Sequence, residues 1–442
     1  MSEAPFLLTD IASSVGASQA DRAVDGAMRA LQTGTAPIEV IRAAARGAAL
    51  HYDVGVGRPP MGLAALAAAT NLFPFLEARL HPLPTLQAVV LAASEKKAAQ
   101  PARPPALVNG EITHLGRSFL FAARDGNLPE AESIFLGMIR EGVERRIAGD
   151  ILFRAAAEDM GHGGLKLVVA VKLWQLARAL HFRDARTILR PAVQFLVAGA
   201  RDGSSYRAVL ETLGKEWVDL EGLATGGRPL DAEGRGKASA TLGTGDPAAC
   251  VAGTLALLQD GFAASSLAET FSVEAAKKLL AATEDARAAA DGLLVAHAAR
   301  FVISFTRSPD RLFALFQTAL RLRSPASAIH RPLVQRRRGD RDEFARIVDA
   351  LEARQSDAAV ARTRSYLERG RPRDPLLGML VEVACRDSAV GNEGLNVLLA
   401  DACASETLAS RAPEPAMALA KSIASSPADR TAYEAWSSLF AR

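Results

Sequence analysis

Four glycines mark equivalent points in a helical pattern that repeats along this chain of 442 residues: Gly34, Gly142, Gly261 and Gly370. Each follows an apolar stretch with helical spacing, and each is expected to end a helix as its C′ residue, where glycine accepts a left-handed backbone. A small residue lies eleven positions before each glycine and an apolar residue three positions before it: Ala23, Ala131, Cys250 and Ala359, then Leu31, Ile139, Leu258 and Leu367. This spacing predicts a helix face that packs closely at one end and fills a core at the other.

The likeness continues downstream of the glycines. A second helix is expected to follow three of them and to end seventeen positions on, at His51, Asp159 and Asp387, whereas the third copy needs an insertion there. A Gly-Leu pair then opens a third apolar helix in every copy, and the pairs are Gly62-Leu63, Gly164-Leu165, Gly292-Leu293 and Gly394-Leu395. A unit of this size cannot bury its apolar faces alone, so the copies are expected to pack on one another.

The repeat and the composition together predict an all-α fold built from about four diverged helical modules. Aromatic residues make up only 5% of the chain and alanine is abundant, which favours closely packed helices over sheets. The modules could stack as an open helical-repeat array, close into a ring or pack as separate bundles. Breaks at Pro101–Gly110, Thr225–Gly245 and around Arg331–Arg341 predict modules at 1–100, 101–224, 246–335 and 336–442, with a glycine-rich linker at 225–245.

Charge and cysteine content narrow the class of protein. The 52 basic and 49 acidic residues give a net charge of +3, which is too balanced to predict binding to nucleic acid or to an anionic membrane. The three cysteines, Cys250, Cys385 and Cys403, are far apart and odd in number, which favours a reducing compartment without a disulfide framework. Because we find neither a signal peptide nor a long uncharged apolar window, we expect a cytoplasmic protein without a transmembrane helix.

No strong catalytic signature occurs in the chain, which lacks GxxxxGK[ST], GxSxG, HExxH and CxxC sequences. Polar residues gather instead near the helix junctions of the copies, with His51 and Asp53 in the first, His162 in the second and His297 in the third. Imidazole and carboxylate are the ligands that iron, zinc and manganese take in helical proteins. If the copies face a common centre, these four residues would form a metal site.

The same kind of group could act in acid–base catalysis instead. The segment AAEDMGHGGLK brings Asp159, His162 and Lys166 together, and LLVAHAARF contains His297, so these four are the catalytic candidates. His162 lies between glycines at a helix start, where burial against the helix dipole would lower its pKa. The structural alternatives are that His51 and Asp159 only cap helix ends, and that His297 is a hydrogen-bonded core residue.

Two stretches resemble uncharacterised bacterial helical proteins that are sometimes fused to Rieske-type domains. The first is Gly126–Gly199, which contains EDMGHGGLKLVVAVKLWQLA, and the second is HPLPTLQAVVLAASE, which starts at His81. The arrangement is also similar to that of questin oxidase-like proteins, in which a Gly-His pair precedes an apolar helix and a later helix carries another histidine, here His162 and His297. The corresponding helix start in the first copy lacks the histidine, and no Rieske pattern of Cys and His pairs occurs.

The resemblance implies an oxidoreductase that acts on a small organic substrate in secondary metabolism, with NADPH or a metal ion as a candidate cofactor. The repeat architecture alone favours a different class, a helical-repeat scaffold that binds a protein partner without catalysis. An accessory subunit that has lost its chemistry is a third alternative. For all three we expect no membrane and no nucleic-acid partner.

Overall fold

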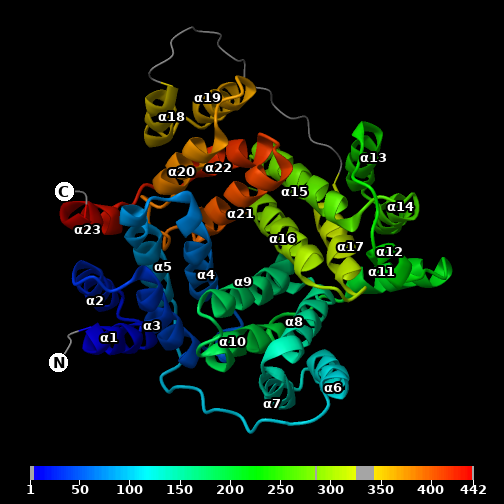
Figure 1. The fold of residues 1–442 in the computed structure, drawn as a ribbon, viewed down its shortest axis with the longest axis horizontal. Helices are drawn as coiled ribbons and strands as arrows, with labels where there is room; N and C mark the ends of the chain where they lie inside the picture. The colour runs from blue at the N-terminus through cyan, green and yellow to red at the C-terminus, as the bar shows by residue number, and fades with distance from the viewer. Residues whose placement is uncertain (1–3, 284–285, 325–342, 441–442) are drawn as a thin grey trace.

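The computed structural model describes residues 4–283, 286–324 and 343–440. Within these residues the chain forms 23 α-helices, four short 3-10 helices and no β-strand. The prediction of an all-α fold is therefore confirmed. Figure 1 shows the helices grouped around a common centre, with the first and last helices on the same side of the molecule.

Most helices belong to four modules of five helices each. The first module contains α1 (Ala4–Gly16), α2 (Ala20–Gln32), α3 (Pro37–Leu50), α4 (Met61–Leu72) and α5 (Pro82–Ser94). The second contains α6 (Ile112–Asp125), α7 (Leu128–Met138), α8 (Gly142–Ala157), α9 (Leu165–Ala179) and α10 (Ala185–Ala198). The third contains α13 (Ala232–Leu242), α14 (Pro247–Gln259), α15 (Ala264–Ala281), α16 (Ala286–Phe305) and α17 (Arg311–Leu322). The fourth contains α18 (Glu343–Glu352), α19 (Ser356–Glu368), α20 (Arg373–Ala384), α21 (Leu395–Ser410) and α22 (Glu414–Ser425).

Three further helices lie outside this scheme. Helices α11 (Ser204–Lys215) and α12 (Leu220–Ala224) come between the second and third modules, and α23 (Thr431–Phe440) follows the fourth. Figure 1 shows α11 and α12 at the edge of the molecule beside the third module.

Local sequence signals set where the helices begin. Pro37, Pro82 and Pro247 occupy the first positions of α3, α5 and α14, where a missing N–H costs nothing because that group has no partner within the helix. The carboxylate of Asp246 precedes α14 and accepts a hydrogen bond from the N–H of Ala249 at 2.8 Å, which satisfies one of the free donors at the helix start.

The four glycines of the repeat all have the left-handed backbone that was expected, with φ of 87° at Gly34, 65° at Gly142, 79° at Gly261 and 68° at Gly370. Three of them follow a helix end as C′ residues. Gly142 does not, because the N–H of Arg140 bonds to the carbonyl of Met138 and turns the chain out of α7. Gly142 begins α8 instead, so the expectation that it ends a helix is wrong.

The fourth helices of the modules form a closed ring. Helix α4 packs against α9, α9 against α16, α16 against α21, and α21 against α4. Figure 1 shows these four helices around the middle of the molecule, with the remaining helices of each module outside them. Of the three arrangements that the sequence leaves open, the chain thus adopts the closed ring.

A buried glutamine helps to close this ring between the two ends of the chain. Gln87 of α5 donates a hydrogen bond to the carbonyl of Cys385, 298 positions away, and accepts one from the N–H of Ala389, both at 3.0 Å. The Gln87 side chain is fully buried. Because a buried amide without partners costs free energy, these bonds favour one position of the fourth module against the first.

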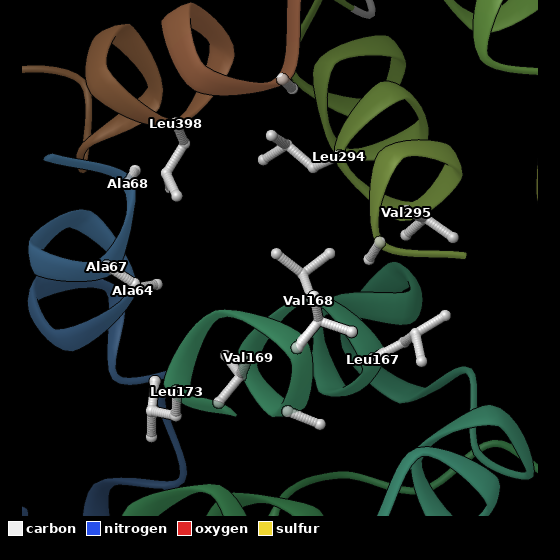
Figure 2. Packing of buried hydrophobic residues seen from close by; sticks show 14 of the residues in the cluster. Ala64, Ala67, Ala68, Leu167, Val168, Val169, Leu173, Leu294, Val295 and Leu398 are labelled. Atoms are coloured by element: carbon white, nitrogen blue, oxygen red, sulfur yellow. The ribbon is translucent and has the colours of Figure 1, made fainter. Parts of the chain in front are cut away.

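Apolar side chains fill the centre of the ring. Figure 2 shows Leu398 of α21, Leu294 of α16 and Val168 of α9 pointing toward it, while α4 contributes Ala64 and Ala67. All five are buried, and burial of a Leu or Val side chain stabilises a fold by about 1.5–3 kcal/mol. The alanines let α4 lie close to its neighbours. Where these five residues lie, the centre of the ring is therefore a packed apolar core.

The stretch 225–245, predicted as a linker, is only partly irregular because Ala232–Leu242 forms α13. Asp231 caps this helix by accepting a hydrogen bond from the N–H of Gly234 at 2.7 Å. Gly234 also lies so close to Phe262 that a Cβ there would be 2.8 Å from the aromatic ring. Glycine thus serves close packing in this segment. The predicted boundary between residues 335 and 336 lies outside the described residues.

One described helix, α16, is long and apolar enough to cross a membrane by length and composition alone, although none is expected from the sequence. This helix packs against α9, α15, α17 and α21. It also carries the buried imidazole of His297. These are properties of a core helix, which passes the same test of length and composition.

Candidate functional site

The polar junctions that recur in the sequence tie the end of the third helix of a module to the end of its fifth helix. In the second and fourth modules, the N–H of the residue after Asp159 or Asp387 donates to a carbonyl beyond the fifth helix. In the first module, an N–H beyond the fifth helix donates to the carbonyl of His51 instead. The bonds join Met160 N to Asp202 O (2.9 Å), Ser388 N to Asp429 O (2.6 Å) and Ala98 N to His51 O (2.8 Å). Polar residues recur at these points for a structural reason.

His51 and Asp53 are both engaged by the backbone of the first module. The Nδ1 of His51 lies 3.1 Å from the carbonyl oxygen of Ala98, and its ring lies against Gly16, where a Cβ would come within 2.7 Å of the imidazole. Asp53 caps the short 3-10 helix Val54–Val56 by accepting a hydrogen bond from the N–H of Gly55 at 3.0 Å. Both side chains serve local structure.

Asp159 and Lys166 form an ion pair within the second module. The fully buried Nζ of Lys166 donates to Oδ2 of Asp159 at 2.6 Å and to the carbonyls of Leu196 and Gly199 at 2.9 and 3.2 Å. The other oxygen of Asp159 accepts hydrogen bonds from two backbone N–H groups, at 2.8 and 2.9 Å. Burial lowers the pKa of Lys166, while Asp159 opposes that shift. Neither group has an unused polar atom aimed at a ligand, so the pair fits a structural role.

His162 lies next to this pair with a left-handed backbone, at φ 54°. Its Nε2 accepts a hydrogen bond from the N–H of Ala200 at 3.2 Å, and its ring packs on Phe195. Burial first, and the charge of Lys166 second, lower the pKa of His162. The direction of the shift and burial as its main cause agree with the prediction, whereas the second cause is the charge of Lys166 and not the helix dipole.

The four predicted metal ligands, His51, Asp53, His162 and His297, do not come together. His51, Asp53 and His162 are tied to the junctions of their own modules, whereas His297 lies within α16. Apolar side chains occupy the ring centre where the ligands were expected to meet. Within residues 4–283, 286–324 and 343–440, no group of three or more His, Cys, Asp or Glu side chains is placed to hold a metal ion. The convergent arrangement is therefore not found.

A polar pocket of about 410 Å³ lies at the C-terminal halves of α4, α9 and α16 and at the middle of α21. All four ring helices contribute to it, so no single module could build it. The polar residues that line it are Thr70 and Asn71 from α4, Gln175 from α9, His297, Arg300 and Ser304 from α16, and Asp401 and Ser405 from α21. Pro74 and Phe301 add apolar surface.

An ion pair spans the ring at this pocket. Lys172 of α9 pairs with Asp401 of α21, and each side chain is only 1% exposed. These two helices do not follow one another in the ring, because α4 and α16 lie between them. The same oxygen of Asp401 accepts a hydrogen bond from the amide of Asn71 at 2.9 Å, and that amide also donates to Oε1 of Gln175 at 3.0 Å. Four side chains from three ring helices thus form one network.

His297 is the predicted site residue that lies in this pocket. Its Nδ1 is 2.7 Å from Oε1 of Glu406, and the same oxygen accepts a hydrogen bond from Nε of Arg300 at 2.7 Å. The Nε2 of His297 is buried and has no hydrogen-bond partner in the described part of the chain. With Nδ1–H donating to Glu406, Nε2 of the neutral imidazole is a base with a free lone pair.

Burial alone would raise the pKa of Glu406, but hydrogen bonds and charges from His297 and Arg300 outweigh it and lower the pKa below 4.5. The ionised carboxylate therefore stabilises the fold above about pH 4.5, and this contribution is lost as pH falls through the lowered pKa. We expect Glu406→Gln to lose about 3 kcal/mol at neutral pH and to lose less additional stability than the wild type at acid pH.

Urea unfolding at several pH values between about 7 and 3 measures this difference. Glu233→Gln is the matched control, because Glu233 forms an exposed ion pair with Lys237 and exposed pairs contribute little. Equal stability of Glu406→Gln and the wild type at neutral pH would contradict the assignment of Glu406.

A second pocket, of about 480 Å³, lies beside Asp159 and is lined by Glu158, Arg124 and Tyr206 among others. Glu158 is bound by Arg124 and by Arg154, at 2.7 and 2.6 Å, and Asp159 is bound by Lys166. Because both carboxylates are held by cations, neither of them is a free base. The ring pocket is the better candidate for chemistry.

Most residues of the ring pocket were not predicted from the sequence. Lys172 lies in an apolar run, LKLVVAVKLWQLA, and Asp401 lies in a similar one, NVLLADACA. A charge within a helix that is apolar on all sides is a signal for a buried pair. Lys172 and Arg300 also each lie eight positions after the glycine of a Gly-Leu pair. Their partners on α21 could not be identified without the ring.

Comparisons of the chain with models of protein families, with characterised proteins and with solved structures give no match.

Proposed function

We propose that this protein is an enzyme that acts on a small organic molecule bound in the ring pocket, with His297 as the group that transfers a proton. The observation that carries the proposal is the buried imidazole itself. Its Nδ1 is held by Glu406, while its Nε2 has no partner in the described residues and the residue lines a pocket. A histidine that only served packing would be expected to have both nitrogens satisfied.

The pairing of His297 with Glu406 has the form of a general base. A carboxylate that accepts the Nδ1–H fixes the tautomer and stabilises the imidazolium that forms when Nε2 takes a proton. Arg300 keeps Glu406 ionised and lines the same pocket, so its guanidinium lies where negative charge that develops on a substrate during proton transfer could be stabilised. Acid–base chemistry is thus the class of reaction that these groups favour.

An oxidoreductase with NADPH or a metal ion is the narrower proposal, and it is supported by the resemblance to questin oxidase-like proteins alone. An oxidation of a C–H or O–H group also needs a proton acceptor, which His297 would supply. The residues of the pocket do not identify the cofactor.

A binding test with a pocket-blocking variant decides between an enzyme and a non-catalytic protein. Ligand-observed NMR with a library of small, polar organic fragments should find compounds that bind the wild type. Ser405→Trp, which fills the pocket, should abolish that binding. Leu408→Trp on the same helix is the control, because Leu408 is exposed and does not line the pocket. Binding that persists in Ser405→Trp, or no binding to the wild type, would contradict the proposal.

The scaffold alternative is favoured by a different observation, the exposed indole of Trp217. This side chain is 93% exposed, and it lies between α11 and α12, which the other modules lack. Tryptophan is enriched at the centres of protein interfaces. If no fragment binds the ring pocket, the surface around Trp217 is the place to look for a protein partner.

A further inference from the structure

We propose that the ligand of the ring pocket is an uncharged, polyhydroxylated ring compound, a monosaccharide or a cyclitol. This inference rests on the proposed function, because it assigns a substrate class to the same pocket. It follows from the charges, the hydrogen-bonding atoms and the apolar surfaces that meet there.

The charges of the pocket cancel within the protein. Lys172 is paired with Asp401, and Arg300 with Glu406. Both carboxylates are at most 1% exposed. The charge of each cation is therefore already balanced by a carboxylate that water does not screen. A carboxylate, phosphate or ammonium ligand would add an unpaired charge beside these two matched pairs, which is unfavourable away from water. An uncharged ligand avoids that penalty.

The amide pair Asn71 and Gln175 presents a donor beside an acceptor. The Asn71 nitrogen donates to both Gln175 and Asp401, and its carbonyl oxygen accepts no bond from the described residues, so it can accept one from a ligand. The Gln175 oxygen accepts one of these bonds, which leaves its NH2 group as a free donor. A hydroxyl group donates and accepts at the same time, so it matches this arrangement, whereas a carbonyl or an ether oxygen would use only the donor.

The hydroxyl-bearing residues Ser405, Thr70 and Ser304 line the same pocket as the amide pair. The hydroxyl of Ser405 lines the pocket and makes no hydrogen bond to the described part of the chain. Those of Thr70 and Ser304 donate to the backbone of their own helices and can still accept. Several hydroxyl groups on one ligand could therefore bind at once.

Two apolar surfaces line the same pocket. The ring of Phe301, which stacks on Phe305 with a centroid separation of 5.5 Å, offers a rigid flat face, and Pro74 is the other apolar wall residue. The C–H face of a sugar or cyclitol ring can pack on such a face while its hydroxyl groups turn to polar atoms. A volume of about 410 Å³ lies within the range of small-molecule sites.

Isothermal titration calorimetry with matched compounds tests the proposal on the full-length protein. The neutral probes are D-glucose and myo-inositol, and the charged probes are D-glucuronate and D-glucosamine. We expect at least one neutral probe to bind with a Kd at least about tenfold lower than that of either charged probe. Gln175→Ala should raise that Kd about fivefold, whereas Gln259→Ala on the exposed face of α14 should not change it.

The alternative outcomes separate this inference from the proposed function. Stronger binding of a charged probe, or binding of phenol but not of the neutral probes, would overturn the assignment of a polyol. If none of the four probes binds while other fragments bind in a manner that Ser405→Trp abolishes, the substrate class is wrong and the proposed function stands. If no fragment binds the pocket at all, both fail.

Discussion

Replacing Lys172 with methionine is expected to destabilise the protein by about 3–5 kcal/mol. Methionine fills a similar volume but leaves the carboxylate of Asp401, which is 1% exposed, without its cation. Among the residues that the structure describes, only the amide of Asn71 would still donate to that oxygen. Breaking one half of a buried ion pair is costly because the remaining charge keeps its full desolvation penalty. Urea denaturation of the purified variant measures the loss.

The double variant Lys172→Met/Asp401→Leu shows whether the pair itself stabilises the ring. Removing both charges should restore most of the lost stability, because apolar residues of similar size often replace a buried ion pair at little cost. Lys237→Met, at an exposed pair with Glu233, is the surface control and should change stability little. A double variant as unstable as the sum of its single variants would contradict this account.

The double variant also separates a structural role of the pair from a role in binding. In the proposed site, Asp401 holds the amide of Asn71 in place, and that amide orients Gln175. A stable double variant that no longer binds a ligand of the ring pocket would mean that the pair is retained for the site. A stable variant that binds the ligand normally would mean that ligand binding does not require this network.

The sequence predicts those features of the fold that depend on local signals. Helical spacing, alanine content and the glycines of the repeat predict an all-α modular chain. Ala23, Ala131, Cys250 and Ala359, the small residues of that repeat, are all fully buried. Such positions can be recognised because each helix carries its own periodicity. The four Gly-Leu pairs all lie at or within the helices that form the ring, but the prediction that each pair opens its helix is wrong for Gly292-Leu293, which lies inside α16.

Closure of the ring and the pairs within it could not be predicted in this way. Lys172 and Asp401 lie 229 positions apart, and His297 and Glu406 lie 109 positions apart. Nothing near either residue in the sequence identifies its partner, because the pairing depends on how whole modules are arranged. Of the predicted site residues, His297 lies in the ring pocket and His51 does not. Both are histidines near apolar segments, and only the fold distinguishes an imidazole held by a backbone carbonyl from one held by a buried carboxylate.

The other large effect is expected at Nε2 of His297. For any compound that the wild-type protein converts, His297→Gln should lower kcat by about 10²- to 10⁴-fold, the usual contribution of a general acid or base. Glutamine can still donate a hydrogen bond to Glu406, so the loss of activity should not come from unfolding. The measurement uses compounds that bind through the ring pocket, incubated in D2O, with NMR to follow product formation and the entry of deuterium at carbon.

Binding and catalysis should respond differently to this substitution. The Kd of the ligand should change only a few fold, because glutamine keeps a hydrogen-bonding side chain in the pocket, whereas kcat should fall by orders of magnitude. His162→Gln is the matched control, since the Nε2 of His162 already accepts a hydrogen bond from the backbone. If His162→Gln abolished turnover and His297→Gln did not, the chemistry would belong to the junction of the second module and the assignment of the ring pocket would be wrong.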